Sequence, residues 1–337
     1  MRSAQAQSTR LPHTGSRKPA RLRTVALAML APLLWILLGC GGLSKEQQEK
    51  FDLHVRNAQR YYDVGDYEQA EQQVRKGLEV DPDDLKARHL LAWTLLQRGE
   101  PQTIRQAEEE FGKLVRRDSE DFRIHMGLAN SRFKLGMIRR GQATTLERRE
   151  DTELAARARE ESETLIDEAE ASYETVLELN EDFPRALSGL GQIKALHNET
   201  DEALVLFGRY LELASKTRRY YEGGKRSRIL TDDQLETLDG KISSNIDQEV
   251  KVRDLVANLL FDKGQPREAI DHLDRILALQ PRRSETYLLR AQCRSRLGEY
   301  DRAAEDVKLF LRKTKRTAED PLVREANELL AEYVAQQ

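Results

Sequence analysis

The chain has 337 residues, of which 34% are charged and only 6% are aromatic, and its formal net charge is −3. This composition excludes a protein embedded in a membrane along most of its length, and the negative sign argues against a general nucleic-acid binder, whose surface must be positive. Its two cysteines, Cys40 and Cys293, are too few for a disulfide-stabilised scaffold.

The first 40 residues have the order of an export signal. Six basic residues and no acidic residue precede an apolar run from Thr24 to Leu38, which contains Pro32. A helix that spans a bilayer needs about 20 apolar residues, so this run is short for a membrane anchor. The pattern therefore predicts a secretory signal.

The end of the run, Leu37-Leu38-Gly39-Cys40, resembles the lipobox of bacterial lipoproteins. The resemblance implies that residues 1–39 are a signal peptide and that residues 40–50 form a short tether with diacylglycerol and fatty acyl groups on Cys40. Gly41 is not the aspartate that retains enteric lipoproteins in the inner membrane. The implied location is therefore the periplasmic face of the outer membrane, with the outer leaflet of the inner membrane as the less favoured site. The alternatives are an uncleaved anchor, or a plain secretory signal with an incidental cysteine.

Beyond residue 50 the chain repeats with a period of about 34 residues. Six copies begin at Phe51, Leu85, Phe122, Pro184, Val250 and Ser284. Their eighth positions are all small: Ala58, Ala92, Ala129, Gly191, Ala257 and Ala291. So are the facing positions of the second helix: Ala70, Ala107, Ala169, Ala203, Ala269 and Ala303. A large apolar residue follows four positions later: Val74, Phe111, Tyr173, Phe207, Leu273 and Val307. The turns between the helices are expected at Gly65, Gly99, Gly136, Asn198, Gly264 and Gly298, which tolerate a left-handed backbone.

This pattern resembles the tetratricopeptide repeat, a helix-turn-helix unit of 34 residues. The resemblance implies an all-α, right-handed solenoid with units one to four in residues 51–217 and units five and six in residues 250–317. Residues 318–337 are expected to form a capping helix, because the end of a solenoid otherwise exposes apolar surface.

The third unit carries a predicted helical insertion, residues 136–168. A narrow apolar stripe with helical spacing runs through it to the residue that follows it: Leu146, Leu154, Ala158, Leu165 and Ala169. We expect both helices of the unit to lengthen into a hairpin that projects by about 20 Å. The hairpin is either a docking arm or a solvated charged extension held by ion pairs between successive turns.

A second interruption, residues 218–249, is predicted to be an irregular or helical linker. The basic stretch from Lys216 to Arg228 contains two tyrosines and could touch anionic lipid head groups or nucleic acid. Gly223 and Gly224 favour a flexible loop between repeats instead.

In the family that the repeats resemble, the first helices line a concave groove that holds an extended peptide or a helix of a partner. The resemblance places thirteen residues in this groove: Gln59, Lys86, His89, Trp93, Arg123, Met126, Asn130, Phe133, Arg185, Gln192, Lys251, Asn258 and Gln292. Five are carboxamides that can bond a peptide backbone, and four are basic. We hypothesise that units two to five bind an extended, acidic segment of another protein. The alternative is that these polar residues are simply solvated.

The sequence shows no pattern typical of an enzyme. Its six histidines fall in separate units without metal-ligand spacing, no Gly-x-Ser-x-Gly elbow occurs, and Gly189-Leu-Gly191 is not a phosphate loop. We therefore expect no catalysis, metal, nucleic acid or small-molecule substrate, and no cofactor other than the acyl groups on Cys40. Two functions remain: a lipid-anchored adaptor for other envelope proteins, or a structural subunit of an envelope assembly that binds through the insertion and the convex face.

Overall fold

The computed structural model describes residues 43–226 and 230–336, and within them the chain forms helices only. Cys40 and the predicted signal peptide lie outside the described residues. No helix in the described part combines the length and the apolar character that a bilayer span requires. The helices are α2 (Lys45–Asp63), α3 (Tyr67–Val80), α4 (Leu85–Arg98), α5 (Pro101–Val115), α6 (Phe122–Glu147), α7 (Thr152–Leu179), α8 (Pro184–Leu196), α9 (Thr200–Lys225), α10 (Asp232–Asp262), α11 (Pro266–Leu279), α12 (Ser284–Arg296), α13 (Tyr300–Lys313) and α14 (Pro321–Ala335).

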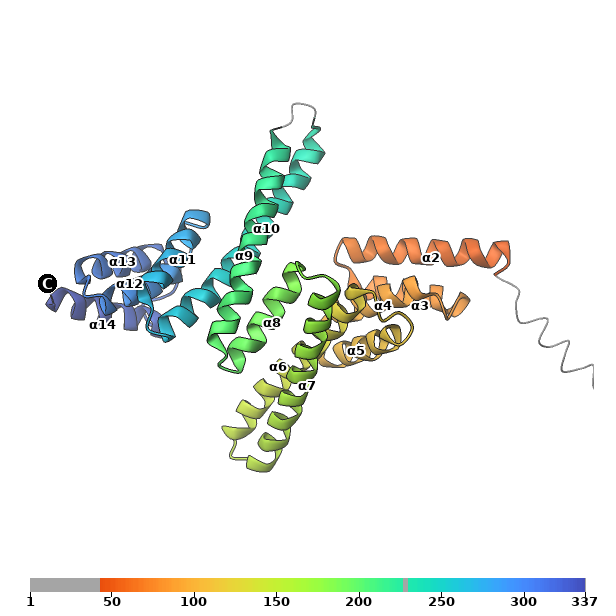
Figure 1. The fold of residues 1–337 in the computed structure, drawn as a ribbon, viewed down its shortest axis with the longest axis horizontal. Coiled ribbons are helices and arrows are strands. Elements are labelled where there is room, and N and C mark those ends of the chain that lie inside the picture. Colours follow the sequence, from red (N-terminus) through yellow and green to blue (C-terminus); the bar gives the residue numbers. More distant parts are fainter. Residues whose placement is uncertain (1–42, 227–229, 337) are drawn as a thin grey trace, which may run out of the picture.

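These helices form six antiparallel pairs and a last helix, stacked in chain order (Figure 1). Each helix packs chiefly against the helices before and after it in the chain, as in a solenoid. The predicted all-α repeat fold is therefore confirmed. In the C-terminal cap α14, Val323, Ala326 and Tyr333 are buried against the last pair, which closes the apolar end of the stack.

Local sequence fixes where the helices begin. Side-chain oxygens cap free backbone N–H groups at six helix starts: Ser44, Asp66, Asp84, Asp121, Thr231 and Asp320. Proline occupies the first turn of four helices, where no backbone donor is lost: Pro101, Pro184, Pro266 and Pro321.

The two helices of each pair cross at the small residues that the repeat register predicts. The eleven alanines at these positions are all 0% exposed, and Gly191 is also buried. A Cβ atom on Gly191 would lie only 2.7 Å from Cε1 of Phe207, so no side chain fits there without displacing the ring. The prediction of close helix crossings is confirmed.

The turn glycines follow the prediction except in the third unit. Gly65, Gly99, Gly264 and Gly298 have φ between 76° and 83°, and Asn198 has φ 62°. Gly136 lies inside α6 instead, where a Cβ atom would be 2.8 Å from the Ile166 side chain. The expected turn at Gly136 is therefore wrong, because the insertion moves the turn to residues 148–151 and leaves the glycine at a helix crossing.

The insertion forms the predicted helical hairpin, which we call the first hairpin. Helices α6 and α7 have 26 and 28 residues, against 13 to 15 in the ordinary helices of the neighbouring units, and both project from the stack (Figure 1). The predicted apolar stripe is partly wrong, because Leu154 is 46% exposed. The buried seam of α7 consists of Ala155, Ala158, Ser162, Ile166 and Ala169, whose small members let the helices approach closely.

The segment after the fourth unit forms a second hairpin, which the sequence did not predict. Helix α9 continues to Lys225 and α10 starts at Asp232, so the expected flexible loop over residues 216–228 is wrong as far as Lys225. The second hairpin projects away from the stack on the side opposite to the first (Figure 1).

A buried ion cluster holds the base of the second hairpin. Glu249 on α10 is 0% exposed and accepts hydrogen bonds from Arg218 on α9 and, at 2.8 Å, from Nε of Arg253. A buried carboxylate with two guanidinium partners fixes the register of the two helices, because losing either partner leaves an uncompensated charge.

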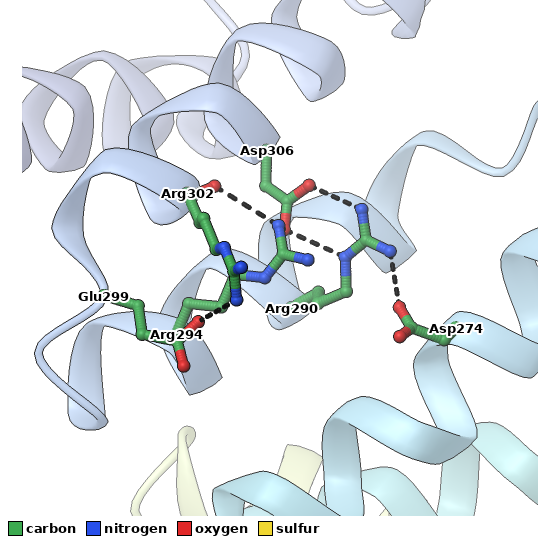
Figure 2. Close-up of polar contacts among 6 residues, drawn as sticks. All are labelled: Asp274, Arg290, Arg294, Glu299, Arg302 and Asp306. Carbon is green, nitrogen blue, oxygen red and sulfur yellow. Dashed lines mark hydrogen bonds and ion pairs between the residues drawn. The ribbon is translucent and has the colours of Figure 1, made fainter.

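A second cluster of this kind joins the last two repeat units (Figure 2). Asp306 on α13 is 1% exposed and accepts hydrogen bonds from Arg290 at 2.6 and 2.9 Å and from Arg294 at 2.8 Å. Arg290 reaches Asp274 on α11 at 2.5 Å, so three successive helices are tied together.

Candidate functional site

The first helices of the repeats line a groove made of three adjoining pockets. The outer, middle and inner pockets have volumes of about 620, 520 and 420 Å³. Trp93 on α4 and Arg185 on α8 line all three, so the pockets form one continuous surface. The structure brings together here eleven of the predicted residues: Gln59, Lys86, His89, Trp93, Arg123, Met126, Asn130, Phe133, Arg185, Gln192 and Lys251. Asn258 and Gln292 line a separate pocket of about 380 Å³ at the C-terminal end.

Trp93 is held rigidly at the centre of the groove. Its indole Nε1 donates a hydrogen bond to Nε2 of His89, one helical turn earlier, at 3.0 Å. Its ring also lies edge-to-face on Phe111, with the centroids 5.3 Å apart. Burial lowers the pKa of His89, which keeps the imidazole neutral and able to accept this bond. A fixed aromatic side chain loses little entropy when a ligand packs on it.

The predicted carboxamides already make hydrogen bonds within the chain. Oδ1 of Asn130 accepts from the Tyr173 hydroxyl at 2.8 Å, and Nε2 of Gln192 donates to the Ser188 carbonyl at 3.1 Å. Gln59 donates to Asp63 at 2.7 Å. Because a carboxamide has two donor and two acceptor sites, these bonds orient the group and leave capacity for a ligand.

The groove has a positive bias in an acidic chain. Arg123 is neutralised locally, since it forms two hydrogen bonds with Asp121 at 2.8 and 2.9 Å and holds the pKa of that carboxyl below its usual range. Lys86, Arg185 and Lys251 form no ion pair with any described residue. Among the described residues, no carboxylate lines the middle or the inner pocket. These two pockets therefore favour an anionic ligand.

A comparison with protein families agrees with this geometry. The family model described as tetratricopeptide repeat matches residues 55–103, 155–216 and 257–321, together just over half of the chain. The chain belongs to the tetratricopeptide repeat family. Repeats of this family are typically non-catalytic modules for protein interaction, so the groove lies on an interaction scaffold.

Solved structures with a similar tetratricopeptide fold come from several bacteria. A thermophilic repeat protein of Thermus thermophilus is 19% identical, with TM-score 0.43, covering 73% of this chain and 98% of its own. A repeat protein of Parabacteroides merdae is 16% identical, with TM-score 0.42, covering 85% and 99%. PilF of Pseudomonas aeruginosa is 17% identical, with TM-score 0.49, covering 87% and 100%. No curated protein matches the chain.

The tetratricopeptide register did not locate every residue of the groove. Phe122, Phe183 and Tyr210 add aromatic surface to the middle pocket, and Asn245 and Gln248 add a polar wall from α10. The repeat register does not reach the last two, because the sequence predicts an irregular or helical linker over residues 218–249. The sequence does carry a signal for them, since no glycine or proline interrupts residues 241–262, as a continuous helix requires.

Met126 also departs from its expected place at the surface of the groove. It is only 3% exposed, so it forms the floor beneath the middle and inner pockets. A ligand would touch little of it, and its contribution is to support the aromatic walls.

Two other groups of reactive side chains lie outside the groove of this tetratricopeptide protein. Asp167, Glu170 and His197 could bring three ligand atoms together, but the Lys194 ammonium sits 2.6 Å from Glu170 and competes with a metal ion. Cys293 is fully buried on α12, and burial raises its pKa to about 11. A buried thiol of this kind is a packing residue, because the nucleophilic thiolate is disfavoured.

Proposed function

We propose that this protein is a membrane-anchored scaffold of the bacterial cell envelope that holds an extended segment of a partner protein in its groove. The observation that carries the proposal is the continuous groove around Trp93, where Lys86, Arg185 and Lys251 form no ion pair with any described residue and the middle and inner pockets have no carboxylate among the described residues that line them. A partner segment with acidic side chains would supply that charge.

The groove offers an extended chain two kinds of contact. Carboxamides such as Asn130 and Gln192 are pre-oriented by their internal bonds and can still pair with backbone N–H and C=O groups. Aromatic walls around Trp93 bury apolar side chains of the partner, which supplies most of the affinity at the centre of such interfaces. Hydrogen bonds to the backbone of the partner would contribute affinity, and the pockets for its side chains would determine specificity.

The proposed anchor is a lipid on Cys40, after removal of residues 1–39. The support is the lipobox-like Leu37-Leu38-Gly39-Cys40, and Gly41 in place of aspartate favours the periplasmic face of the outer membrane. Helix α2 is capped by Ser44, so only about four residues would separate the lipid from folded structure. At about 3.5 Å per residue, the scaffold would stand within roughly 20 Å of the membrane. Several acyl chains on one residue give firm attachment.

A structural subunit of an envelope assembly is the second candidate function. The observation in its favour is the presence of two projecting hairpins rather than one, with exposed apolar side chains on both. Leu154 on the first hairpin is 46% exposed and Tyr220 on the second is 77% exposed. In this case the hairpins, and not the groove, would contact the partner.

Charge reversal within the groove tests the first proposal. The variant Lys86→Glu/Arg185→Glu/Lys251→Glu is expected to lose most of the partner that the wild-type chain retains when it is purified from its native envelope. The matched control reverses the same number of exposed cations outside the groove: Lys76→Glu, Arg267→Glu and Lys308→Glu. Equal capture by both triple variants would contradict groove binding and favour the hairpins.

A further inference from the structure

The middle pocket lies where the chain departs from the repeat period. Helices α4, α6 and α8 supply three of its walls, and α9 and α10 close the remaining side with Tyr210, Asn245 and Gln248. Asn245 belongs to the extra turns of α10 that form the second hairpin. Ordinary stacking of 34-residue units would not place a polar wall here. This pocket therefore restricts the choice of ligand in a way that is specific to this chain.

The opposite side of the middle pocket is aromatic. Phe122 and Phe183 lie edge-to-face, with their ring centroids 5.0 Å apart, and Trp93 continues the same surface. A pocket of about 520 Å³ accepts one large side chain together with part of its backbone. Edge and face contacts of this kind favour an aromatic guest over an aliphatic one.

Asn245 leaves an unsatisfied hydrogen-bond acceptor in the polar wall. Its Oδ1 atom is buried and has no hydrogen-bond partner among the described residues. The terminal torsion of an asparagine is soft, so rotation about it can turn this acceptor toward a guest. A phenyl ring or an aliphatic chain brings no donor, whereas the indole N–H of tryptophan and the hydroxyl of tyrosine each bring one.

The charges beside the pocket select the residues that flank the guest. Arg185 lines the middle pocket and continues into the inner pocket, where Lys134 and Lys251 add two more cations. No carboxylate among the described residues lines either pocket. Aspartate or glutamate next to the aromatic guest would meet these cations.

We infer that the partner segment is acidic and inserts one donor-bearing aromatic side chain, tryptophan or tyrosine, into the middle pocket, where Asn245 accepts its hydrogen bond. The inference rests on the proposed function, since it names the chemistry of the segment that the groove holds. The second hairpin, which carries Asn245, would then select the side chain that enters the middle pocket.

Selection from a phage-displayed library of random 12-residue peptides on the full chain tests this inference. The expected outcome is enrichment of tryptophan or tyrosine flanked by aspartate and glutamate. The best peptide is then synthesised with its donor removed, by N-methylation of the indole or by Tyr→Phe, and both forms are titrated. We expect removal of the donor to weaken binding about tenfold to wild type and by less than twofold to Asn245→Leu. Asn327→Leu, on α14 and outside all three groove pockets, is the matched control and should keep the tenfold effect.

Each other outcome overturns the inference in a distinguishable way. Groove-binding peptides that lack an aromatic donor, or a donor effect that persists in Asn245→Leu, would refute the insertion of an aromatic side chain that bonds Asn245. The proposed function would still stand. If no selected peptide loses affinity for the charge-reversed variant of the groove, both the inserted aromatic side chain and the proposed function are refuted.

Discussion

Replacing Glu249 by glutamine should strongly destabilise the junction between the fourth and fifth repeats. Glu249 is 0% exposed and binds Arg218, which is 5% exposed, and Arg253. The neutral amide keeps one acceptor oxygen but turns an NH2 group toward the other guanidinium, so both cations lose the charge of Glu249 and one of them also loses its hydrogen-bond acceptor. Breaking a buried ion pair from one side costs about 3–5 kcal/mol.

The free energy of unfolding of the Glu249→Gln variant can be measured by urea titration, with hydrogen exchange to locate the weakened region. We expect a loss of about 3–5 kcal/mol and faster exchange in α9 and α10, because each solenoid unit depends only on its neighbours. Glu153→Gln serves as the control, since its ion pair with Arg157 is exposed and contributes about 0.3–0.5 kcal/mol. A Glu249→Gln loss below about 1 kcal/mol would refute the reasoning, because it would mean that water reaches the cluster.

Three further predictions concern single groups. Asn130→Ala should cost about 1–3 kcal/mol in urea unfolding, because the buried Tyr173 hydroxyl loses its partner, and an unchanged midpoint would contradict the hydrogen bond. Burial lowers the pKa of His89 in the folded chain below its value in the unfolded chain, which is about 6.5. The stability that the neutral imidazole contributes is therefore fully present above about pH 6.5 and is lost as the pH falls through the folded-state pKa. The indole N–H resonance of Trp93 should shift on that acidification in wild type but not in His89→Gln. Cys293, with its pKa raised to about 11, should resist iodoacetamide at about pH 8 until the chain unfolds; rapid alkylation of the native protein would contradict its burial.

Much of the scaffold could be predicted because few residue types satisfy its geometry. Where two helices cross at close range only alanine or glycine fits, so positions such as Ala58 and Gly191 mark the repeat register directly in the sequence. The same register located most of the groove, since residues at one position of each unit point to one face of the solenoid.

The misassigned positions lie where the period is interrupted. Gly136 matches a turn in the repeat register, but the inserted residues allow α6 to continue and use the glycine for contact with Ile166. Gly223 and Gly224 suggested a loop, yet the burial of Arg218 against Glu249 holds the second hairpin in helical form around them. Tertiary contacts of this kind override local propensity.

The charge state of the groove could be predicted only in part. Arg123 and Arg185 occupy equivalent positions of their units, so the sequence predicts the same role for both, as cations of the groove. In the structure Arg123 is paired with Asp121 at the start of α6, whereas Arg185 has no such partner among the described residues. Side-chain pairing of this type depends on rotamers, which the repeat pattern does not specify.

Site-specific photo-crosslinking from the chain in its native cells tests the central claim most directly. A photoreactive residue at Gln97, which is exposed and lines the inner pocket, is compared with the same residue at Leu154 on the first hairpin and at Tyr220 on the second. The groove account predicts that a partner protein is captured from position 97, that the captured peptide is acidic, and that neither hairpin position captures it. Capture from position 154 or 220 with none from position 97 would contradict it.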